Sequence, residues 1–287
     1  MTLAGKLSST DKLLAGYLGF VTVLAAARGL LDRPTGWWLL AAHLLFWGLL
    51  ALFARLRDGD RVGQWIHVLY PLLLLIPLYW EIGVFGWTYG VDRGLAHDLL
   101  VQRWEGAIFG GQVSYDWIRR YPSVFWSGLF HLAYFAYYPI IISGPVLLVI
   151  HGRRDAARGV LFPMMIAFVA CYVVFLLYPV GGPYYAFDQP TGPVREVWSA
   201  RLVYRLLEGG SSFGAAFPSS HVAVTVSTTY ALWHYWRALA RWVTVPCVLL
   251  TVGTVYCQMH YGIDAALGVL VGLGAGWLGT VKVSGEQ

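Results

Sequence analysis

The sequence predicts an all-α integral membrane protein of about eight transmembrane helices. Of its 287 residues, 58% are hydrophobic and only 12% are charged. Soluble domains carry about 25% charged residues, so lipid as well as protein has to cover this excess of apolar side chains. Eight apolar runs have lengths that suit a bilayer span, and they cover roughly residues 13–31, 36–54, 65–87, 123–150, 160–180, 218–236, 242–258 and 260–279.

The first two runs form a predicted N-terminal part, residues 1–64, ahead of a main part at 65–287. Arg28 interrupts the first run near its end, where its long side chain can reach the headgroups. Several later runs contain prolines, which bundled helices tolerate because neighbours satisfy the freed carbonyls: these are Pro71, Pro77, Pro139, Pro145 and Pro163.

Two segments of the main part have a distinct pattern. Residues 95–109 are too polar to cross a bilayer, and we expect a helix in the interface with Arg103 and Glu105 facing water. In the last run, glycines recur every four residues on one face, which predicts close helix packing: these are Gly268, Gly272 and Gly276.

Charge predicts the orientation of the spans. With eight spans, both termini lie on one side, and three short loops of that side are rich in arginine: Arg55, Arg57, Arg61, Arg153, Arg154, Arg158, Arg237 and Arg241. The positive-inside rule therefore places the termini in the cytoplasm of a bacterial-type plasma membrane, with the long connections 88–122 and 181–217 outside. The net charge of +5 is spread over loops, so it does not predict a nucleic-acid partner.

A histidine and an aspartate stand four residues apart at the start of the last run. On a helix, His260 and Asp264 share one face. A carboxylate inside an apolar span is costly and indicates a functional site. A carboxylate bonded to one ring nitrogen fixes the tautomer and leaves the other nitrogen basic, as a nucleophilic histidine requires.

The sixth run begins with Pro218, Ser219, Ser220 and His221, a pattern typical of a helix start. A helix N-terminus attracts anions, and a histidine in its first turn can give a proton to a leaving oxygen. The predicted topology places three segments at one membrane face: His221, His260 and the turn Tyr178-Pro179-Val180-Gly181-Gly182-Pro183.

These pieces resemble the type-2 phosphatidic acid phosphatase superfamily. Its Pro-Ser-Gly-His motif is matched by Pro218 to His221, and its later His and Asp are matched by His260 and Asp264. The resemblance implies a six-helix core, corresponding to about residues 65–279, and chemistry without a metal ion or cofactor. It also implies that His260 forms a phosphohistidine, that Asp264 orients it and that His221 protonates the leaving group.

The chain departs from that pattern in two places. Gly253 and Thr254 stand where the family has Ser-Arg, so the arginine expected to hold phosphate is missing. The family's first motif is replaced by Tyr178-Pro179 with Gly182-Pro183, which resembles the branch that includes inositol phosphorylceramide synthase. The stretch from Glu105 to Gln112 resembles bacterial members of the same branch, some of which are transferases.

A phosphate dianion in a pocket of low dielectric needs a countercharge. Because Thr254 carries no charge, another side chain has to supply it. The candidates in the 181–217 connection are Arg195, Arg201 and Arg205, with Arg119 and Arg120 behind them. Their spacing does not choose among them.

The sequence therefore predicts a phosphatase of a lipid phosphate or diphosphate, with its site at the outer face of the membrane. A phosphotransferase that moves a phospho-headgroup to an acceptor alcohol shares the chemistry up to the phosphohistidine, so the sequence leaves both open. A transporter or structural protein with an incidental polar pair is the remote alternative. Haem ligation by two histidines in or near spans is a further alternative, and the candidates are His43, His67, His131 and His234. The sequence predicts neither the headgroup nor the oligomeric state.

Overall fold

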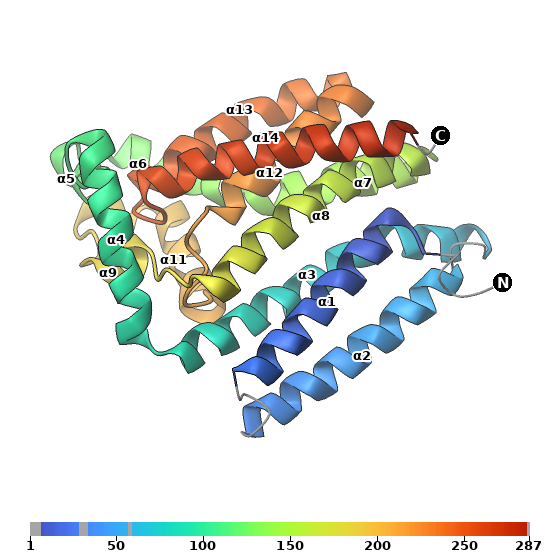
Figure 1. Ribbon diagram of the computed structural model, residues 1–287. Coiled ribbons are helices and arrows are strands. Elements are labelled where there is room, and N and C mark those ends of the chain that lie inside the picture. The colour runs from blue at the N-terminus through green and yellow to red at the C-terminus, as the bar shows by residue number, and fades with distance from the viewer. Residues whose placement is uncertain (1–6, 29–33, 57–58, 286–287) are drawn as a thin grey trace.

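The computed structural model describes residues 7–28, 34–56 and 59–285, which are almost entirely helical. The helices of this part are α1 (Ser9–Ala27), α2 (Pro34–Leu56), α3 (Arg61–Tyr89), α4 (Val91–Phe109), α5 (Val113–Arg120), α6 (Val124–Phe135), α7 (Tyr137–Ile150), α8 (Arg154–Leu177), α9 (Pro183–Ala186), α10 (Pro193–Glu196), α11 (Trp198–Gly210), α12 (Ser220–Tyr235), α13 (Arg237–Tyr256) and α14 (Gly262–Gly285). Figure 1 shows the long helices running beside one another, with α4, α5, α9 and α11 gathered at one end.

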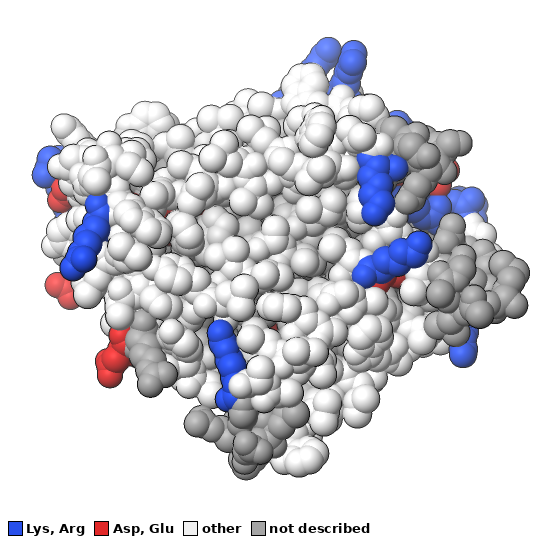
Figure 2. Space-filling model, viewed as in Figure 1, with Lys and Arg blue, Asp and Glu red and all other residues white. Residues whose placement is uncertain are grey.

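Seven helices of the described part are long and apolar enough to cross a membrane: α1, α2, α3, α6 and α7 taken together, α8, α13 and α14. Charged side chains lie mostly toward the two ends of these helices on the face in Figure 2, and the surface between them is largely uncharged. The all-α membrane fold predicted from composition is therefore confirmed, and the chain is an integral membrane protein.

The remaining predicted run, the sixth at 218–236, corresponds to α12, which differs from the other spans in length and surroundings. It has 16 residues, so it measures about 24 Å, which is shorter than a hydrocarbon core of about 30 Å. It packs against α7, α8, α13 and α14, and most of its residues are buried. Since protein covers this helix on most sides, it needs neither the length nor the hydropathy of a lipid-facing span.

Two predicted segments have different boundaries in the structure. The run at 123–150 is divided into α6 and α7 at Ala136. Pro139 lacks a backbone N–H, so the carbonyl of Phe135 has no helical partner there. The helix expected at 95–109 is α4, which begins four residues earlier, at Val91. The division of the chain after residue 64 stays a prediction.

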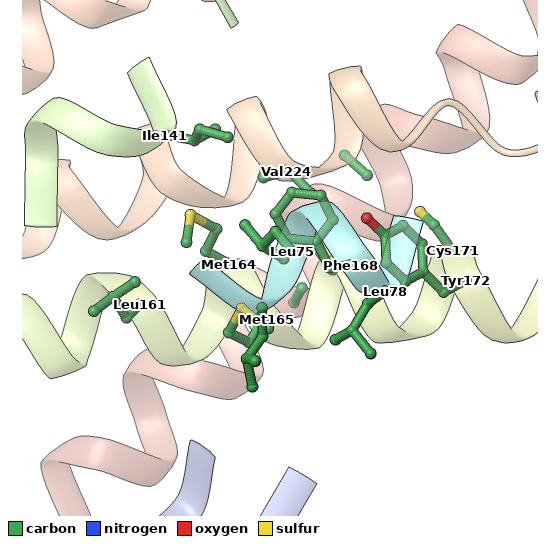
Figure 3. Close-up of a cluster of buried hydrophobic side chains, with 14 of the residues drawn as sticks. Leu75, Leu78, Ile141, Leu161, Met164, Met165, Phe168, Cys171, Tyr172 and Val224 are labelled. Atoms are coloured by element: carbon green, nitrogen blue, oxygen red, sulfur yellow. The ribbon is translucent and has the colours of Figure 1, made fainter. Parts of the chain in front are cut away.

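The core surrounds α8, which packs against α1, α3, α7, α12 and α14. Figure 3 shows Met164, Met165 and Phe168 of α8 among side chains from α3 and α12, including Leu75 and Val224. These side chains are all buried. The close packing of α8 fixes the positions of the helices whose ends carry the candidate site.

The glycine face of α14, predicted to pack closely against another helix, lies against α12. A Cβ at Gly272 would lie 2.5 Å from the backbone oxygen of Ala223, and one at Gly268 would lie 2.7 Å from that of Ser219. Only residues without a side chain allow backbones to approach this closely. The contact brings the first turn of α12 beside the first turn of α14.

The N-terminal helices are joined to α3 by two buried pairs of acid and histidine. Asp11 of α1 lies 3.3 Å from His67 and also accepts a hydrogen bond from Tyr70. Glu81 lies 2.9 Å from His43 of α2. His43 and His67, considered above as haem ligands, therefore each contact a carboxylate on a neighbouring helix.

Candidate active site

The three segments that the sequence places at one membrane face meet at one end of the helix bundle (Figure 1). The amide of Ser219, the N-cap of α12, donates to the backbone oxygen of Asp264 in α14 at 3.0 Å. The amide of Ala216 donates to the backbone oxygen of Val180 at 3.1 Å. These backbone bonds join the turn at 178–183 to the starts of both helices.

The two predicted catalytic histidines face each other at this junction. The ring centroids of His221 and His260 are 5.8 Å apart, with the planes tilted by 55°. His221 is the second residue of α12, and His260 lies two residues before α14. At this separation both imidazoles can contact one phosphate group.

The surroundings of His260 determine which ring nitrogen is free. Its Nδ1 donates to the backbone oxygen of Ala216 at 3.0 Å, and the Oδ2 of Asp264 lies 3.5 Å from the same nitrogen. A carbonyl oxygen only accepts hydrogen bonds, so Nδ1 carries the proton and Nε2 has the free lone pair. Burial lowers the pKa of His260 to about 4, although the bond to Ala216 opposes that shift. The ring is therefore neutral near pH 7, as a nucleophile requires.

Asp264 contributes to the site mainly through its contacts with backbone. Its Oδ2 accepts a hydrogen bond from the amide of Tyr261 at 2.9 Å, and the residue is fully buried. The carboxylate thus caps the chain between α13 and α14 while lying beside His260. The sequence predicted this neighbour of the imidazole, but it did not reveal the Ala216 carbonyl, which makes the shorter contact.

His221 lies on an aromatic surface formed by α6 and α7. Its Nε2 is 3.2 Å from the hydroxyl of Tyr134, whose ring stacks on the imidazole at 4.8 Å. The ring of Tyr137 lies 4.4 Å away on a tilted plane. These contacts hold the imidazole on the side of α12 that faces α6 and α7.

The first turn of α12 offers a site for an anion beside both imidazoles. The side chain of Ser219 accepts a hydrogen bond from the amide of Val222 at 3.4 Å and so caps the helix. The N–H groups of Ser220 and His221 have no partner within the helix because they belong to its first turn. Such groups, together with the helix dipole, favour a negative charge.

Asp98 of α4 holds the turn at 178–183 in place. Its carboxylate accepts hydrogen bonds from the amides of Gly181 and Gly182, both at 2.7 Å, and from the hydroxyl of Tyr261 at 2.8 Å. Burial raises the pKa of Asp98, and these hydrogen bonds oppose the shift. The sequence analysis did not identify this residue.

Glu105, about two turns further along α4, holds the start of α14. It accepts hydrogen bonds from the amide of Gly262 at 2.7 Å and from the amide and hydroxyl of Ser114 at 3.0 and 3.1 Å. The expectation that Glu105 faces water is therefore wrong, because the residue is fully buried. Its spacing of seven from Asp98 puts both acids on one face of the helix, and this was the available signal.

The two halves of the predicted substrate-binding turn contact different parts of the protein. Tyr178 stacks on His97 of α4 at 4.1 Å, and the Nδ1 of His97 lies 2.7 Å from the oxygen of Pro179. This half of the turn contacts α4. Gly182, at a φ of 88°, lies against Ala216 so closely that a Cβ there would be 2.7 Å away. The oxygen of Pro183 accepts from Gln258 at 3.4 Å, so the second half adjoins the segment before His260.

Of the candidate arginines, Arg119 makes the most direct contact with the site. It donates to the side-chain oxygen of Gln258, two residues before His260, at 2.6 Å. Arg195 lies over the ring of Tyr204 at 4.4 Å.

The contacts of the other candidate arginines lie away from the two histidines. Arg120 pairs with Asp116 on the surface, and Arg201 and Arg205 are exposed on α11. The hydroxyl of Thr254 donates to the oxygen of Thr251 in its own helix. Within the described ranges, no three His, Cys, Asp or Glu side chains are grouped so that they could hold a metal ion.

Membrane-spanning helices that bring two histidines and an aspartate together at one end define a class of integral membrane protein with a polar site at the bilayer edge. The family model of the PAP2 superfamily matches residues 101–278, more than half of the chain. The chain therefore belongs to the PAP2 superfamily. This superfamily generally contains phosphatases, which supports a phosphoester-hydrolysing enzyme. Comparisons with curated proteins and with solved structures found no match.

Proposed function

We propose that this chain is a phosphatase of a lipid phosphate or diphosphate that works through a phosphohistidine on His260. One observation supports the proposal most. The imidazoles of His260 and His221 lie 5.8 Å apart beside the first turn of α12, and the Nδ1 of His260 donates to the Ala216 carbonyl. That carbonyl leaves the Nε2 lone pair of His260 available for attack.

In the first proposed step, the Nε2 of His260 forms a bond to phosphorus while the bond from phosphorus to the lipid oxygen breaks. His221 enters this step as the imidazolium, which the negative charge of the bound phosphate stabilises. It gives its proton to the lipid oxygen, so the departing group leaves as an alcohol, or as a lipid monophosphate from a diphosphate. The Asp264 carboxylate and the Ala216 carbonyl stabilise the positive charge that develops on the His260 ring. Splitting the reaction through a covalent intermediate lowers each barrier.

In the second step, water attacks phosphorus and the phosphorus–nitrogen bond breaks. His221, now neutral, takes a proton from the water, and inorganic phosphate leaves. His260 returns to its neutral form with the proton still on Nδ1. The free N–H groups of Ser220 and His221 are positioned to bind phosphate oxygens through both steps.

Arg119 is our preferred source of the missing countercharge. It contacts Gln258, which joins α13 to His260, and the residue is half-buried. Its guanidinium also donates to the backbone oxygens of Tyr115 and Asp188, which hold it beside this segment. Phosphate recognition by arginine is strong because the planar guanidinium offers paired donors. Arg195, Arg201 and Arg205 remain candidates with weaker structural support.

We further propose that the site lies at the extracytoplasmic face. The other end of the bundle carries Arg153 between α7 and α8, Arg154 at the start of α8 and Arg237 at the start of α13. Arginines in short loops favour the cytoplasmic side. Reactivity of single cysteines at both ends toward a membrane-impermeant thiol reagent in intact cells tests this orientation.

A phosphotransferase is the second candidate, in the branch that resembles inositol phosphorylceramide synthase. Thr254 in place of the family's arginine, with Tyr178 and Pro179 in the first motif, favours this branch over the standard phosphatases. The phosphohistidine is then resolved by the hydroxyl of an acceptor alcohol in place of water.

The decisive test uses purified full-length protein with labelled phosphatidic acid and a labelled isoprenyl diphosphate, each with and without acceptor alcohols. We expect release of phosphate in the presence of a chelator, loss of turnover in His260→Ala and near loss in His221→Ala. A labelled lipid product that forms only with an alcohol identifies the transferase. Wild-type turnover in pure His260→Ala protein contradicts the mechanism.

A further inference from the structure

A large apolar cavity runs along the protein between α3 and α7 and ends at the candidate site. Its volume is about 850 Å³, which lies within the range of about 300–1,000 Å³ typical of ligand pockets. Side chains of α3 form one wall and side chains of α6 and α7 form the other, while α11 borders one end. Nothing in the catalytic proposal above uses this space.

Apart from tyrosines and a tryptophan, the polar side chains that line the cavity lie at one end. At that end its lining includes Ser220 and His221, beside the hydroxyl of Tyr134. At the other end the lining consists of residues such as Val62, Ile66 and Val146. A molecule that matches this distribution has a phosphate at one end and a hydrocarbon chain behind it.

The same cavity opens sideways toward the bilayer. On α3, Leu73 and Ile76 line it and are 68% and 77% exposed. On α7, Ile142 lines it and is 46% exposed. A soluble protein would cover such apolar positions, whereas a membrane protein presents them to lipid. A lipid chain can therefore enter between α3 and α7 without leaving the hydrocarbon region.

The length of the cavity indicates the kind of chain that it suits. Its lining on α3 extends from Val62 to Tyr79, which corresponds to about 25 Å of α-helix. One leaflet of the hydrocarbon core is about 15 Å deep. A chain that fills the groove from His221 to Val62 thus passes the middle of the bilayer.

We propose that this groove binds the hydrocarbon chain of the substrate and selects for chains long enough to reach its inner end at Val62 and Val146. The inference rests on the proposed function, since it takes the phosphate of the same molecule to lie between His221 and His260. The groove then selects substrates by chain length. Short chains leave its inner half to bulk lipid, and long chains gain contacts along its whole length.

Photolabelling tests occupancy independently of turnover. The probe is hexadecyl phosphate with a diazirine at the chain end, added to purified His260→Ala protein, and the control is the corresponding alcohol. We expect labels on the inner part of α3 and on α7 near Val146, several times stronger for the phosphate than for the alcohol. Labels confined to other faces, or equal labelling by the alcohol, overturn the proposal. Correct labelling with no wild-type turnover of any lipid phosphate retains the groove and rejects the proposed function.

Two tryptophan variants test selection by length. Val146→Trp obstructs the inner end of the groove, while Val245→Trp places the same side chain on α13, at a 62% exposed position outside it. We expect Val146→Trp to lower the ratio of kcat/KM for hexadecyl phosphate to that for octyl phosphate by about tenfold. Val245→Trp should leave this ratio unchanged. An unchanged ratio in Val146→Trp, or the same loss in both variants, overturns the proposed selection by chain length.

Discussion

Replacing Asp98 by asparagine tests whether α4 positions the site through its carboxylates. Asp98 accepts three hydrogen bonds in a buried setting, from Gly181, Gly182 and Tyr261. An asparagine keeps one oxygen and turns an NH₂ group toward at least one of these donors. An unsatisfied buried donor costs about 1–3 kcal/mol, and the loss of charge costs roughly 1 kcal/mol for each of the other two bonds. We expect a destabilisation of about 3–5 kcal/mol.

The same substitution should slow catalysis because Asp98 acts on His260 through the backbone. The turn at Gly181–Gly182 packs on Ala216, and the oxygen of Ala216 holds the Nδ1 of His260 at 3.0 Å. A misplacement of a catalytic group by about 1 Å can cost about 100-fold in rate. We expect kcat to fall by about 10- to 100-fold and KM to change less, because Asp98 does not contact the groove.

The assay is thermal unfolding of the purified protein in detergent, combined with kcat and KM on a lipid phosphate that the wild type turns over. Tyr261→Phe is the matched control. It removes one donor to Asp98 and the acceptor of a hydrogen bond from Gln102, but it leaves both glycine amides paired, so we expect a loss of about 1–2 kcal/mol and a kcat close to wild type. Wild-type stability and kcat in Asp98→Asn would refute the reasoning, as would equal damage in Tyr261→Phe.

Three further predictions concern helix packing, charge and protonation. Gly272→Ala forces a Cβ to within 2.5 Å of a backbone oxygen of α12 and should cost about 1–3 kcal/mol, whereas Gly274→Ala meets nothing within 4 Å; thermal unfolding compares the two. Arg119→Ala should raise KM for a lipid phosphate at least tenfold and Arg201→Ala should not, as steady-state kinetics would show; equal effects would reject Arg119 as the countercharge. Because burial lowers the pKa of His260 to about 4, its imidazole should stay neutral down to that pH; an NMR titration midpoint at 6.5 or above would contradict this.

The parts of this molecule that could be predicted from sequence depend on spacing along the chain. Apolar runs of span length predict the helices, and the motifs around His221 and His260 fall at span ends that the topology brings to one side. The recurring glycines around Gly272 likewise mark the face of α14 that meets α12. Each inference needs only the period of a helix and the thickness of a bilayer.

The remaining features depend on three-dimensional partners that a single sequence does not specify. A carboxylate on an amphipathic helix points either to water or to a buried donor, so Glu105 was assigned to water although Gly262 and Ser114 bind it. The carbonyl of Ala216 carries no sequence signal, because every residue has one. The long side chain of Arg119 reaches Gln258 because α5, between α4 and α6, packs against α13, which ends two residues before Gln258.

The two N-terminal helices influence the site through α3, which forms one wall of the groove and which they hold in position. Halfway along the groove, Tyr70 lines it and also donates to Asp11 of α1, and near the outer end Glu81 accepts from Tyr17 of α1 at 3.0 Å. Separating these partners would leave buried carboxylates unpaired in a low-dielectric interior, which is strongly unfavourable. The other wall has no such anchor at Ala136, where α6 and α7 adjoin without a continuous hydrogen-bond ladder. We therefore expect any widening of the groove for a bulky chain to come from α7 moving against a fixed α3.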